Sequence, residues 1–208
     1  MRVLVLPIGP IDVKVLRVLE RRLPEFLPLE EVIIPEDVLE IPEEAYNPMR
    51  GQYRSSAILS MILAHRPPTD EERVLGVTGV DLYAPGLNFI FGEAMSWRGP
   101  AIISLYRLRP EYYGMPRDDE LFLGRMLKEA VHELGHTLGL VHCVNPRCVM
   151  FFSNSILDTD RKGVQLCGLC HARILENIKS GYSGVFNDFG YGGRGGVGGS
   201  HLGDQKLC

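Results

Sequence analysis

One stretch of the chain decides the fold and the chemistry that we predict: residues 132–142, with the sequence HELGHTLGLVH. Residues four apart on a helix lie one turn apart on the same face, so His132 and His136 can offer imidazole nitrogens to one metal ion. Glu133 lies beside that face and does not have to bind the metal. The stretch therefore predicts a helix that carries two metal ligands and an adjacent free carboxylate.

The third ligand in this stretch, His142, requires the chain to reverse. It lies six residues beyond His136, too far along a continuing helix to reach the same ion. Gly139 falls between the two, where a helix can end in a left-handed conformation that other residues resist. We expect the chain to turn back there and to aim His142 at the metal. Three neutral imidazoles suit Zn²⁺ and leave one coordination position open for water, as in catalytic zinc sites.

Glu133 is then the candidate catalytic residue. It can take a proton from a water molecule activated by the metal and pass it to a leaving amine. This chemistry predicts a zinc metalloendopeptidase or aminopeptidase that acts on a peptide or protein substrate. The alternative is a catalytically weak or inert zinc-stabilised binding or scaffold protein, against which the intact Glu133 argues. Histidines that merely lie on a helix surface or in a core are a further alternative, which the register of Gly139 and His142 disfavours.

Four cysteines with the spacing C-x4-C-x18-C-x2-C follow directly and form a second candidate metal site: Cys143, Cys148, Cys167 and Cys170. Four thiolates make a closed tetrahedral set, which predicts a second, structural Zn²⁺ and hence two zinc ions per chain. Because Cys143 adjoins His142, this zinc would fix the turn that carries the third catalytic ligand. Disulfides, buried free thiols, or His171 in place of one thiolate are the alternatives.

The combined pattern, HExxHxxGxxHC followed by C-x-M and a distant CxxC, resembles the archaemetzincin family of metzincin zinc metallopeptidases. The resemblance is dense over residues 132–170. It implies a methionine turn at Met150, and it leaves Phe152 where some metzincins have a Tyr. It also implies an α/β (α+β) fold of the metzincin-type zincin class, with a mixed sheet, flanking helices and a small zinc-stabilised C-terminal subdomain. Peptides would align along an edge strand, for which residues 88–94 are the candidate.

Hydrophobic patterning and turn residues predict the elements around this segment. We expect strands at residues 2–8, 32–34, 74–78, 88–93 and 101–108, and helices at residues 11–23, 55–65, 119–139 and 164–180. Asp118 is the expected N-cap of the long helix. Strands that alternate with helices, and then follow one another, indicate an α/β sheet with a mixed edge.

We expect three parts along the chain. Residues 1–142 form an N-terminal subdomain that ends in the third His ligand, and residues 143–183 form a C-terminal subdomain with the cysteine site and the methionine turn. Residues 184–208 form a glycine-rich flexible tail that ends in an unpaired Cys208. The alternative for the tail is that it folds over the cleft, with His201 and Cys208 as soft donors.

Composition limits the remaining function classes. The chain has 208 residues, 45% hydrophobic and 23% charged, as in ordinary globular proteins. The CxxC pairs could suggest a zinc module that binds nucleic acid. A net charge of −4 and the lack of a Lys/Arg cluster argue against this function. No apolar run approaches the roughly 20 residues that cross a membrane. The short apolar N-terminal run lacks a cleavage site, so we expect a cytoplasmic protein with reduced cysteines. We also expect a monomer.

Overall fold

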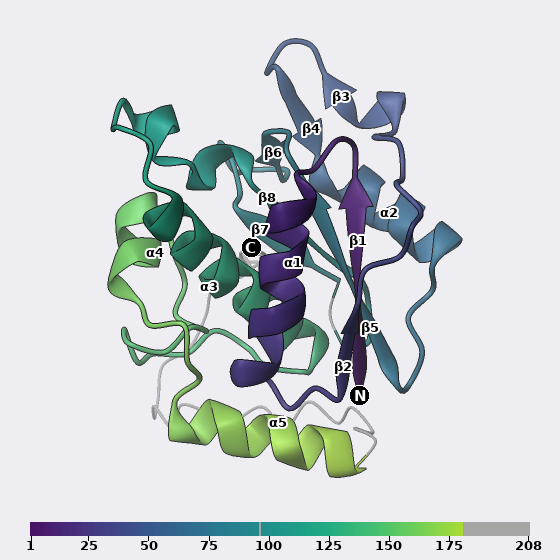
Figure 1. Ribbon diagram of the computed structural model, residues 1–208, viewed down its shortest axis with the longest axis vertical. Coiled ribbons are helices and arrows are strands. Elements are labelled where there is room, and N and C mark those ends of the chain that lie inside the picture. The colour runs from purple at the N-terminus through teal and green to yellow at the C-terminus, as the bar shows by residue number, and fades with distance from the viewer. Residues whose placement is uncertain (96, 181–208) are drawn as a thin grey trace, which may run out of the picture.

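A five-stranded sheet runs through the centre of the computed structural model, which describes residues 1–95 and 97–180 (Figure 1). In spatial order its strands are β2 (Glu31–Ile33), β1 (Arg2–Ile8), β5 (Glu72–Thr78), β8 (Ala101–Ser104) and β7 (Gly92–Ala94). Neighbouring strands are parallel except β7, which pairs antiparallel with β8. The predicted sheet with a mixed edge is confirmed.

Helices cover both faces of this sheet. On one face lie α1 (Val13–Arg22) and α3 (Asp119–Thr137), and on the other lies α2 (Ser55–His65) (Figure 1). Alternate residues of β1 enter the two cores, with Val3 on the side of α1 and α3 and Leu4 on the side of α2. Burial on both faces explains why the sequence of β1 is an unbroken apolar run.

Smaller elements complete the fold. Three short strands form a second sheet: β3 (Tyr46–Asn47), β4 (Gln52–Arg54) and β6 (Leu82–Tyr83). Four 3₁₀ turns connect the larger elements: η1 (Leu23–Glu25), η2 (Glu43–Ala45), η3 (Tyr106–Leu108) and η4 (Pro110–Tyr113). The chain beyond α3 forms the short helix α4 (Ile156–Arg161) and the longer helix α5 (Gly168–Ser180), which lies along the bottom of the view in Figure 1.

The long helix α3 begins at the predicted Asp119 and ends at Thr137, two residues before the predicted end at residue 139. The side chain of Asp118 caps its N-terminus by accepting a hydrogen bond from the backbone N–H of Leu121 at 2.9 Å. At the other end Gly139 has φ 80°, the left-handed conformation that reverses the chain. The backbone N–H of Leu140 then donates to the carbonyl of Gly135 at 3.0 Å, which closes the end of the helix.

Several predicted boundaries are wrong. The strand predicted at residues 88–93 begins only at Gly92, and the strand predicted at residues 101–108 ends at Ser104, where 3₁₀ turns follow. The last helix begins at Gly168 rather than at residue 164, because residues 163–165 bond instead to the turn after His142: Val149 donates to the carbonyl of Gln165 at 3.0 Å.

The sequence analysis also missed α4. Its signal is a capping box, in which Ser155 and Asp158 satisfy each other's backbone N–H groups at the helix N-terminus. This pattern is short, and it stands in a stretch without clear hydrophobic periodicity. A six-residue helix of this kind is stabilised by packing on α3 rather than by its own sequence.

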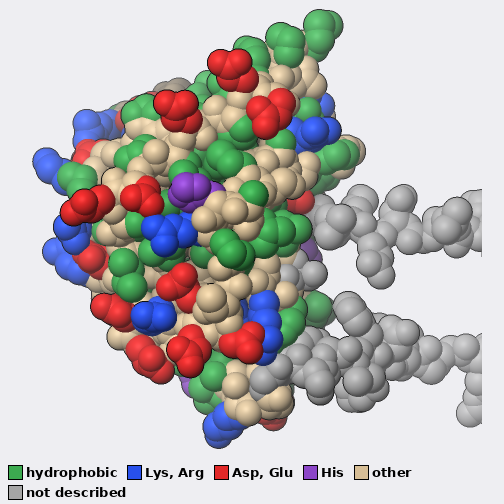
Figure 2. Space-filling view, turned by 90° about the vertical axis from the view of Figure 1, so that its right-hand side faces the viewer, with side chains coloured by type: hydrophobic (Ala, Val, Ile, Leu, Met, Phe, Trp, Pro, Cys, Tyr) green, Lys and Arg blue, Asp and Glu red, His purple; other side chains and the backbone are tan. Residues whose placement is uncertain are grey.

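The molecular surface carries charges of both signs. Acidic and basic side chains are interspersed on the side where α2 lies (Figure 2), in keeping with the small net charge of −4. Within residues 1–95 and 97–180, none of the helices combines the length and the hydropathy of a membrane span. The predictions for the tail and for Cys208 lie outside the described residues.

Candidate metal centre and active site

The three predicted histidines converge at the C-terminal end of α3. One ring nitrogen from each of His132, His136 and His142 lies within 4.8 Å of the other two. The Nε2 atoms of His132 and His136 are 3.2 Å apart, and the ring of His142 stacks on that of His132 with 5.4 Å between centroids. The reversal at Gly139 thus brings the third imidazole to the first two, as the spacing predicts.

Backbone carbonyls orient two of these rings. Nδ1 of His132 lies 2.8 Å from the carbonyl oxygen of Val149, and Nδ1 of His136 lies 2.9 Å from that of Leu140. A carbonyl oxygen only accepts, so each Nδ1 carries the hydrogen and each Nε2 presents its lone pair to the cluster. Metal-binding histidines commonly have such a partner on the other nitrogen.

The electrostatics also suit a metal. Burial lowers the pKa of all three histidines, that of His136 to about 4, and the positive charge of Lys162 lowers the pKa of His132 and His142 further. All three rings are therefore neutral at pH 7, which is the form that ligates. Nε2 of His142 is buried and has no hydrogen-bond partner in the part of the chain that the structure describes. Three neutral nitrogen donors, one of them otherwise unsatisfied, fit Zn²⁺.

Glu133 lies beside the histidines with its carboxyl group buried. Burial, and then the negative charge of Glu129, raise the pKa of Glu133 well above its usual value. Its Oε2 atom finds no hydrogen-bond partner among the described residues. The side chain contacts Gly92, the first residue of the edge strand β7. A buried carboxyl group without a hydrogen-bond partner among the described residues thus lies between the edge strand and the candidate metal centre.

A small cavity of about 70 Å³ opens beside Glu133 and His132. Leu87 and residues 89–92 form one wall and residues 152–154 form another. Glu129 and Lys162 complete the lining, so the cavity is partly apolar and partly charged. Its position next to the carboxyl group of Glu133 makes it the place where part of a substrate would lie.

The turn after His142 supports the centre from below. Met150 is fully buried, and a Cβ atom on Gly135 would lie 2.5 Å from its Sδ, so its side chain packs against α3 between His132 and His136. The carbonyl of Met150 also accepts a hydrogen bond from the backbone N–H of Cys143 at 2.9 Å. The residue expected in the methionine turn thus packs directly under the helix that carries the two histidines.

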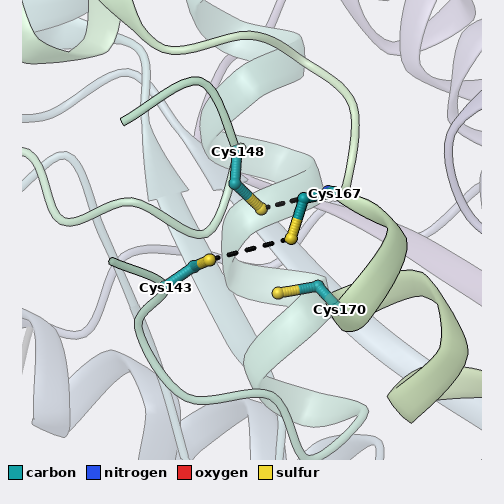
Figure 3. Close-up of side chains that lie close together, drawn as sticks. All are labelled: Cys143, Cys148, Cys167 and Cys170. Atoms are coloured by element: carbon teal, nitrogen blue, oxygen red, sulfur yellow. Dashed lines mark hydrogen bonds between the residues drawn. The ribbon is translucent and has the colours of Figure 1, made fainter. Parts of the chain in front are cut away.

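The four cysteines form a second cluster, with all four sulfur atoms within 4.8 Å of one another. They come from the turn after His142 and from the start of α5, and they point toward a common centre (Figure 3). Sγ of Cys143 and Sγ of Cys167 are 3.8 Å apart, and all four thiols are free rather than joined in disulfides. The backbone N–H of Cys170 lowers the pKa of the Cys167 thiol to about 7. Four converging sulfur donors fit Zn²⁺, and His171 is not one of this group.

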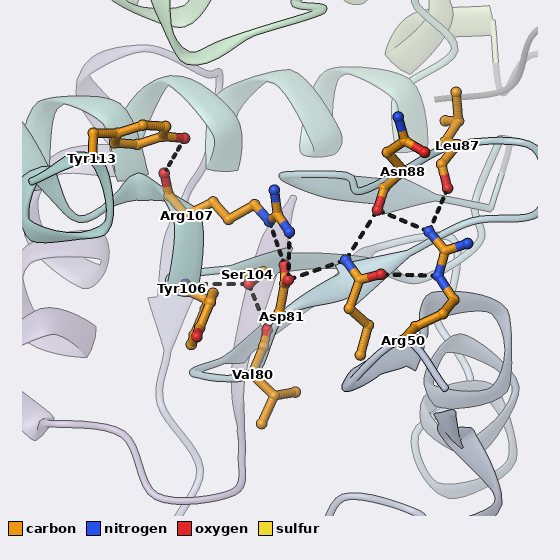
Figure 4. A network of polar contacts seen from close by, with 10 residues as sticks. Arg50, Val80, Asp81, Leu87, Asn88, Ser104, Tyr106, Arg107 and Tyr113 are labelled. Carbon is orange, nitrogen blue, oxygen red and sulfur yellow. Dashed lines mark hydrogen bonds and ion pairs between the residues drawn. The ribbon is translucent and has the colours of Figure 1, made fainter. Parts of the chain in front are cut away.

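A polar network holds the cavity wall at residues 87–91, and the sequence analysis assigned no role to its side-chain members Arg50, Gln52 and Asp81. Arg50 donates through Nη2 to the carbonyls of Leu87 and Asn88, both at 2.9 Å (Figure 4). Gln52 donates to the carbonyl of Asn88 and to Asp81, each at 3.0 Å. These bonds satisfy the backbone of the irregular segment that precedes β7.

Two charged residues of the cavity also escaped the sequence analysis. Glu129 lies three residues before His132, a helical spacing that places it on the same face of α3 and that could have identified it. Lys162 gives no such signal, because it stands in the charged run of residues 160–162, which looks like a solvated loop. The structure buries it completely.

Known proteins resemble this chain in sequence. The model of peptidase family M54 matches residues 16–176. The archaemetzincin of Methanocaldococcus jannaschii is 48% identical over 176 residues, which cover 85% of this chain and 94% of that protein. The archaemetzincin of Pyrococcus furiosus is 44% identical over 183 residues, covering 86% and 95%.

Solved structures agree with the sequence relatives. The crystal structure of archaemetzincin from Archaeoglobus fulgidus, complexed with malonate, has a TM-score of 0.72 and 40% identity, and covers 83% of this chain and 99% of that one. The archaemetzincin structure from Methanopyrus kandleri has a TM-score of 0.75 and 38% identity, with coverage of 86% and 96%.

Proposed function

Because the chain belongs to peptidase family M54 and is a zinc metallopeptidase, we propose that it hydrolyses peptide bonds with Glu133 as the general base. The proposed ligands of the catalytic zinc are His132, His136 and His142. Bound there, zinc supplies a Lewis acid that lowers the pKa of a water molecule and polarises the scissile carbonyl.

The observation that carries this proposal is the state of Glu133. Its carboxyl group is buried, lacks a hydrogen-bond partner among the described residues, and lines the cavity beside His132. A carboxylate with a raised pKa takes a proton from water readily and then holds it. Glu133 can therefore deprotonate the attacking water and deliver the same proton to the leaving amine.

The substrate would lie along β7. This strand is the last in the order of the main sheet, and Gly92 at its start contacts Glu133. An extended peptide that adds to such an edge is held by main-chain hydrogen bonds, whatever its side chains. The proposed peptide-binding segment is therefore shorter than the predicted residues 88–94.

A second zinc would be held by the four cysteines and would be structural, because four thiolates leave no open coordination position. It would join the turn that carries His142 and Met150 to α5. In this proposal the segment from Cys143 onward is a small subdomain whose metal fixes the third ligand of the catalytic site.

The test compares the wild type with Glu133→Ala on a proteome-derived peptide mixture, followed by mass spectrometry. The variant should keep its metal content and lose roughly 10²–10⁴-fold in cleavage rate, the usual contribution of a general base. Glu176→Ala is the control, since Glu176 is exposed on α5. Equal cleavage by the wild type and Glu133→Ala would end the proposal.

A further inference from the structure

Lys162, the residue that follows α4, is fully buried: its side chain has a relative exposure of 0%. Lysine is among the side chains least often buried, because removing an ammonium group from water is unfavourable unless the charge is compensated. This lysine also lines the cavity next to Glu133 and His132. Partner groups must therefore compensate the ammonium group of Lys162 for the loss of water in this cavity.

Its ion pair with Glu129 accounts for the charge but not for the hydrogen bonds. Nζ of Lys162 lies 3.1 Å from Oε1 of Glu129, yet this contact lacks hydrogen-bond geometry, and Nζ has no hydrogen-bond partner in residues 1–95 and 97–180. The same Oε1 accepts a hydrogen bond from Oγ1 of Thr159 at 3.1 Å. An ammonium group has three N–H donors, so donor capacity is left unused in the cavity.

A second unsatisfied donor lines the same cavity. The hydroxyl oxygen of Ser153 is buried without a partner among the residues described. Leu87 and Ile90 contribute apolar wall. A water molecule needs about 10–15 Å³ of such volume, so about 70 Å³ admits several waters or one short side chain. A pocket that combines apolar walls with a few convergent polar groups is the usual form of a ligand-binding site.

Lys162 also lies close to the groups that we assign to catalysis. Its side chain lines the same cavity of about 70 Å³ as Glu133 and His132. A substrate cleaved beside Glu133 therefore places the residue next to its scissile bond at this cavity. A group held by the ammonium of Lys162 would belong to that residue.

We propose that Lys162 determines substrate specificity by binding, in the cavity beside Glu133, a carboxylate that the peptide carries next to the scissile bond. An ammonium group only donates, and a carboxylate is its strongest acceptor where water is excluded. The carboxylate is either an Asp or Glu side chain or the free C-terminus of the substrate. This inference rests on the proposed function, since it takes the cavity as part of the substrate site.

The experiment uses the zinc-loaded enzyme and peptides that differ in one group. One series exchanges Asp for Asn and Glu for Gln on either side of the cleaved bond, and the other compares a free C-terminus with its amide. The wild type should cleave the acidic member of one series with a kcat/KM at least roughly tenfold higher, the effect expected of one charged hydrogen bond. The series that responds identifies the source of the carboxylate.

Two variants test the residue itself. Lys162→Met removes the donors but leaves Glu129 buried without its partner, which can destabilise the fold. The double variant Glu129→Gln/Lys162→Met removes both charges together and avoids this. Either variant should still cleave the neutral peptides and should lose the preference for the acidic ones. Lys162→Arg, which keeps the charge, should retain much of the preference.

Lys128→Met is the matched control, because Nζ of Lys128 donates to the backbone carbonyls of Thr159 and Asp160, and Lys128 does not line this cavity. It should leave the preference unchanged. A double variant that kept the full preference for acidic peptides would overturn the inference, and so would a wild type that cleaved acidic and neutral peptides equally well.

A binding measurement separates this inference from the proposed function. The inactive Glu133→Ala variant is titrated with the same uncleaved peptides in a calorimeter, with and without the Lys162→Met change. Tighter binding of acidic peptides that depends on Lys162, with no cleavage by the wild type, would support the carboxylate site and refute the peptidase mechanism. If the wild type cleaved the peptides but neither assay distinguished acidic from neutral ones, the peptidase mechanism would stand and the carboxylate site would be refuted.

Discussion

Gly92 and Glu133 lie so close that a Cβ atom at position 92 would be 2.6 Å from Cγ of Glu133. The first comes from the edge strand β7 and the second from α3, which packs on that strand. The backbone at Gly92 is not left-handed, so the position requires space rather than unusual dihedral angles. The absence of a side chain on the strand therefore sets where the carboxyl group of the helix can lie.

Gly92→Ala should impair activity much more than stability. The added methyl group meets the flexible end of Glu133, which can move aside at small energetic cost, but the carboxyl group then leaves its position beside His132. We expect kcat/KM to fall at least about tenfold, since small misplacements of catalytic groups reduce rates strongly. The measurements are peptide cleavage and thermal unfolding.

Gly124→Ala is the control for this change, because Gly124 lies within α3 and a Cβ atom there would meet nothing within 4 Å. Replacing an interior helical glycine by alanine should stabilise the protein by about 0.5–1 kcal/mol and leave activity unchanged. Similar losses of activity in both variants would show that the space at Gly92 has no special part in placing Glu133.

Gly139→Ala should destabilise the end of α3 and weaken metal binding. Gly139 has φ 80°, and a Cβ atom there would lie 2.7 Å from Nδ2 of Asn177, which donates to the carbonyl of Leu138 at 2.9 Å. The variant therefore combines backbone strain with displacement of that hydrogen bond and should lose roughly 2–3 kcal/mol. Urea unfolding and zinc titration measure the two effects.

Gly114→Ala separates the two contributions. Gly114 has φ 73°, and a Cβ atom there would contact nothing within 4 Å. Gly114→Ala should lower the free energy of unfolding only by the backbone strain of roughly 1 kcal/mol, and it should keep the affinity for zinc. Equal destabilisation of the two variants would mean that the contact between Gly139 and Asn177 contributes nothing.

Replacing Cys167 and Cys170 by Ser should lower the zinc content from two ions per chain to one at most. The remaining two thiols cannot complete a tetrahedral set, and the lost binding energy is also folding energy. Thermal unfolding should therefore shift to lower temperature, and plasma emission spectrometry should report the metal content. Cys208→Ser, which leaves all four of these cysteines in place, should retain both ions. Full zinc content in the double variant would refute the assignment.

The metal-free protein should lose stability as the pH falls from about 6.5 to 4. Burial lowers the pKa of the three histidines in the folded chain, that of His136 to about 4, whereas unfolded histidines titrate near 6.5. The folded state binds fewer protons in this window, so this contribution to stability is complete above pH 6.5 and is lost as the pH falls.

Urea unfolding of chelator-treated protein at several pH values measures this dependence. His136→Gln removes one of the titrating groups and should flatten the curve between pH 6.5 and 4. A wild-type curve that is flat across this range would contradict the burial of neutral imidazoles.

Both candidate metal sites were predictable from the sequence because their geometry is largely local. His132 and His136 are one helical turn apart, and Gly139 must reverse the chain for His142 to return, so the spacing alone defines the cluster. The close spacing of Cys167 and Cys170 likewise brings two sulfur atoms together at the start of α5, with Cys167 directly before the helix and Cys170 in its first turn. The strand β1 was predictable for a similar reason, because a short unbroken apolar run is typical of a strand that is buried on both faces of a sheet.

Only the tertiary structure decided what surrounds these ligands. Gly92 meets Glu133, and Met150 meets Gly135, because β7 and the turn after His142 pack on α3 from distant parts of the chain. The sequence around Lys162 is typical of an exposed, charged loop. Its burial against Glu129 depends on how α4 packs on α3. Local spacing determines which groups can share a helix face, whereas burial, and with it pKa and specificity, depends on long-range packing that no short motif encodes.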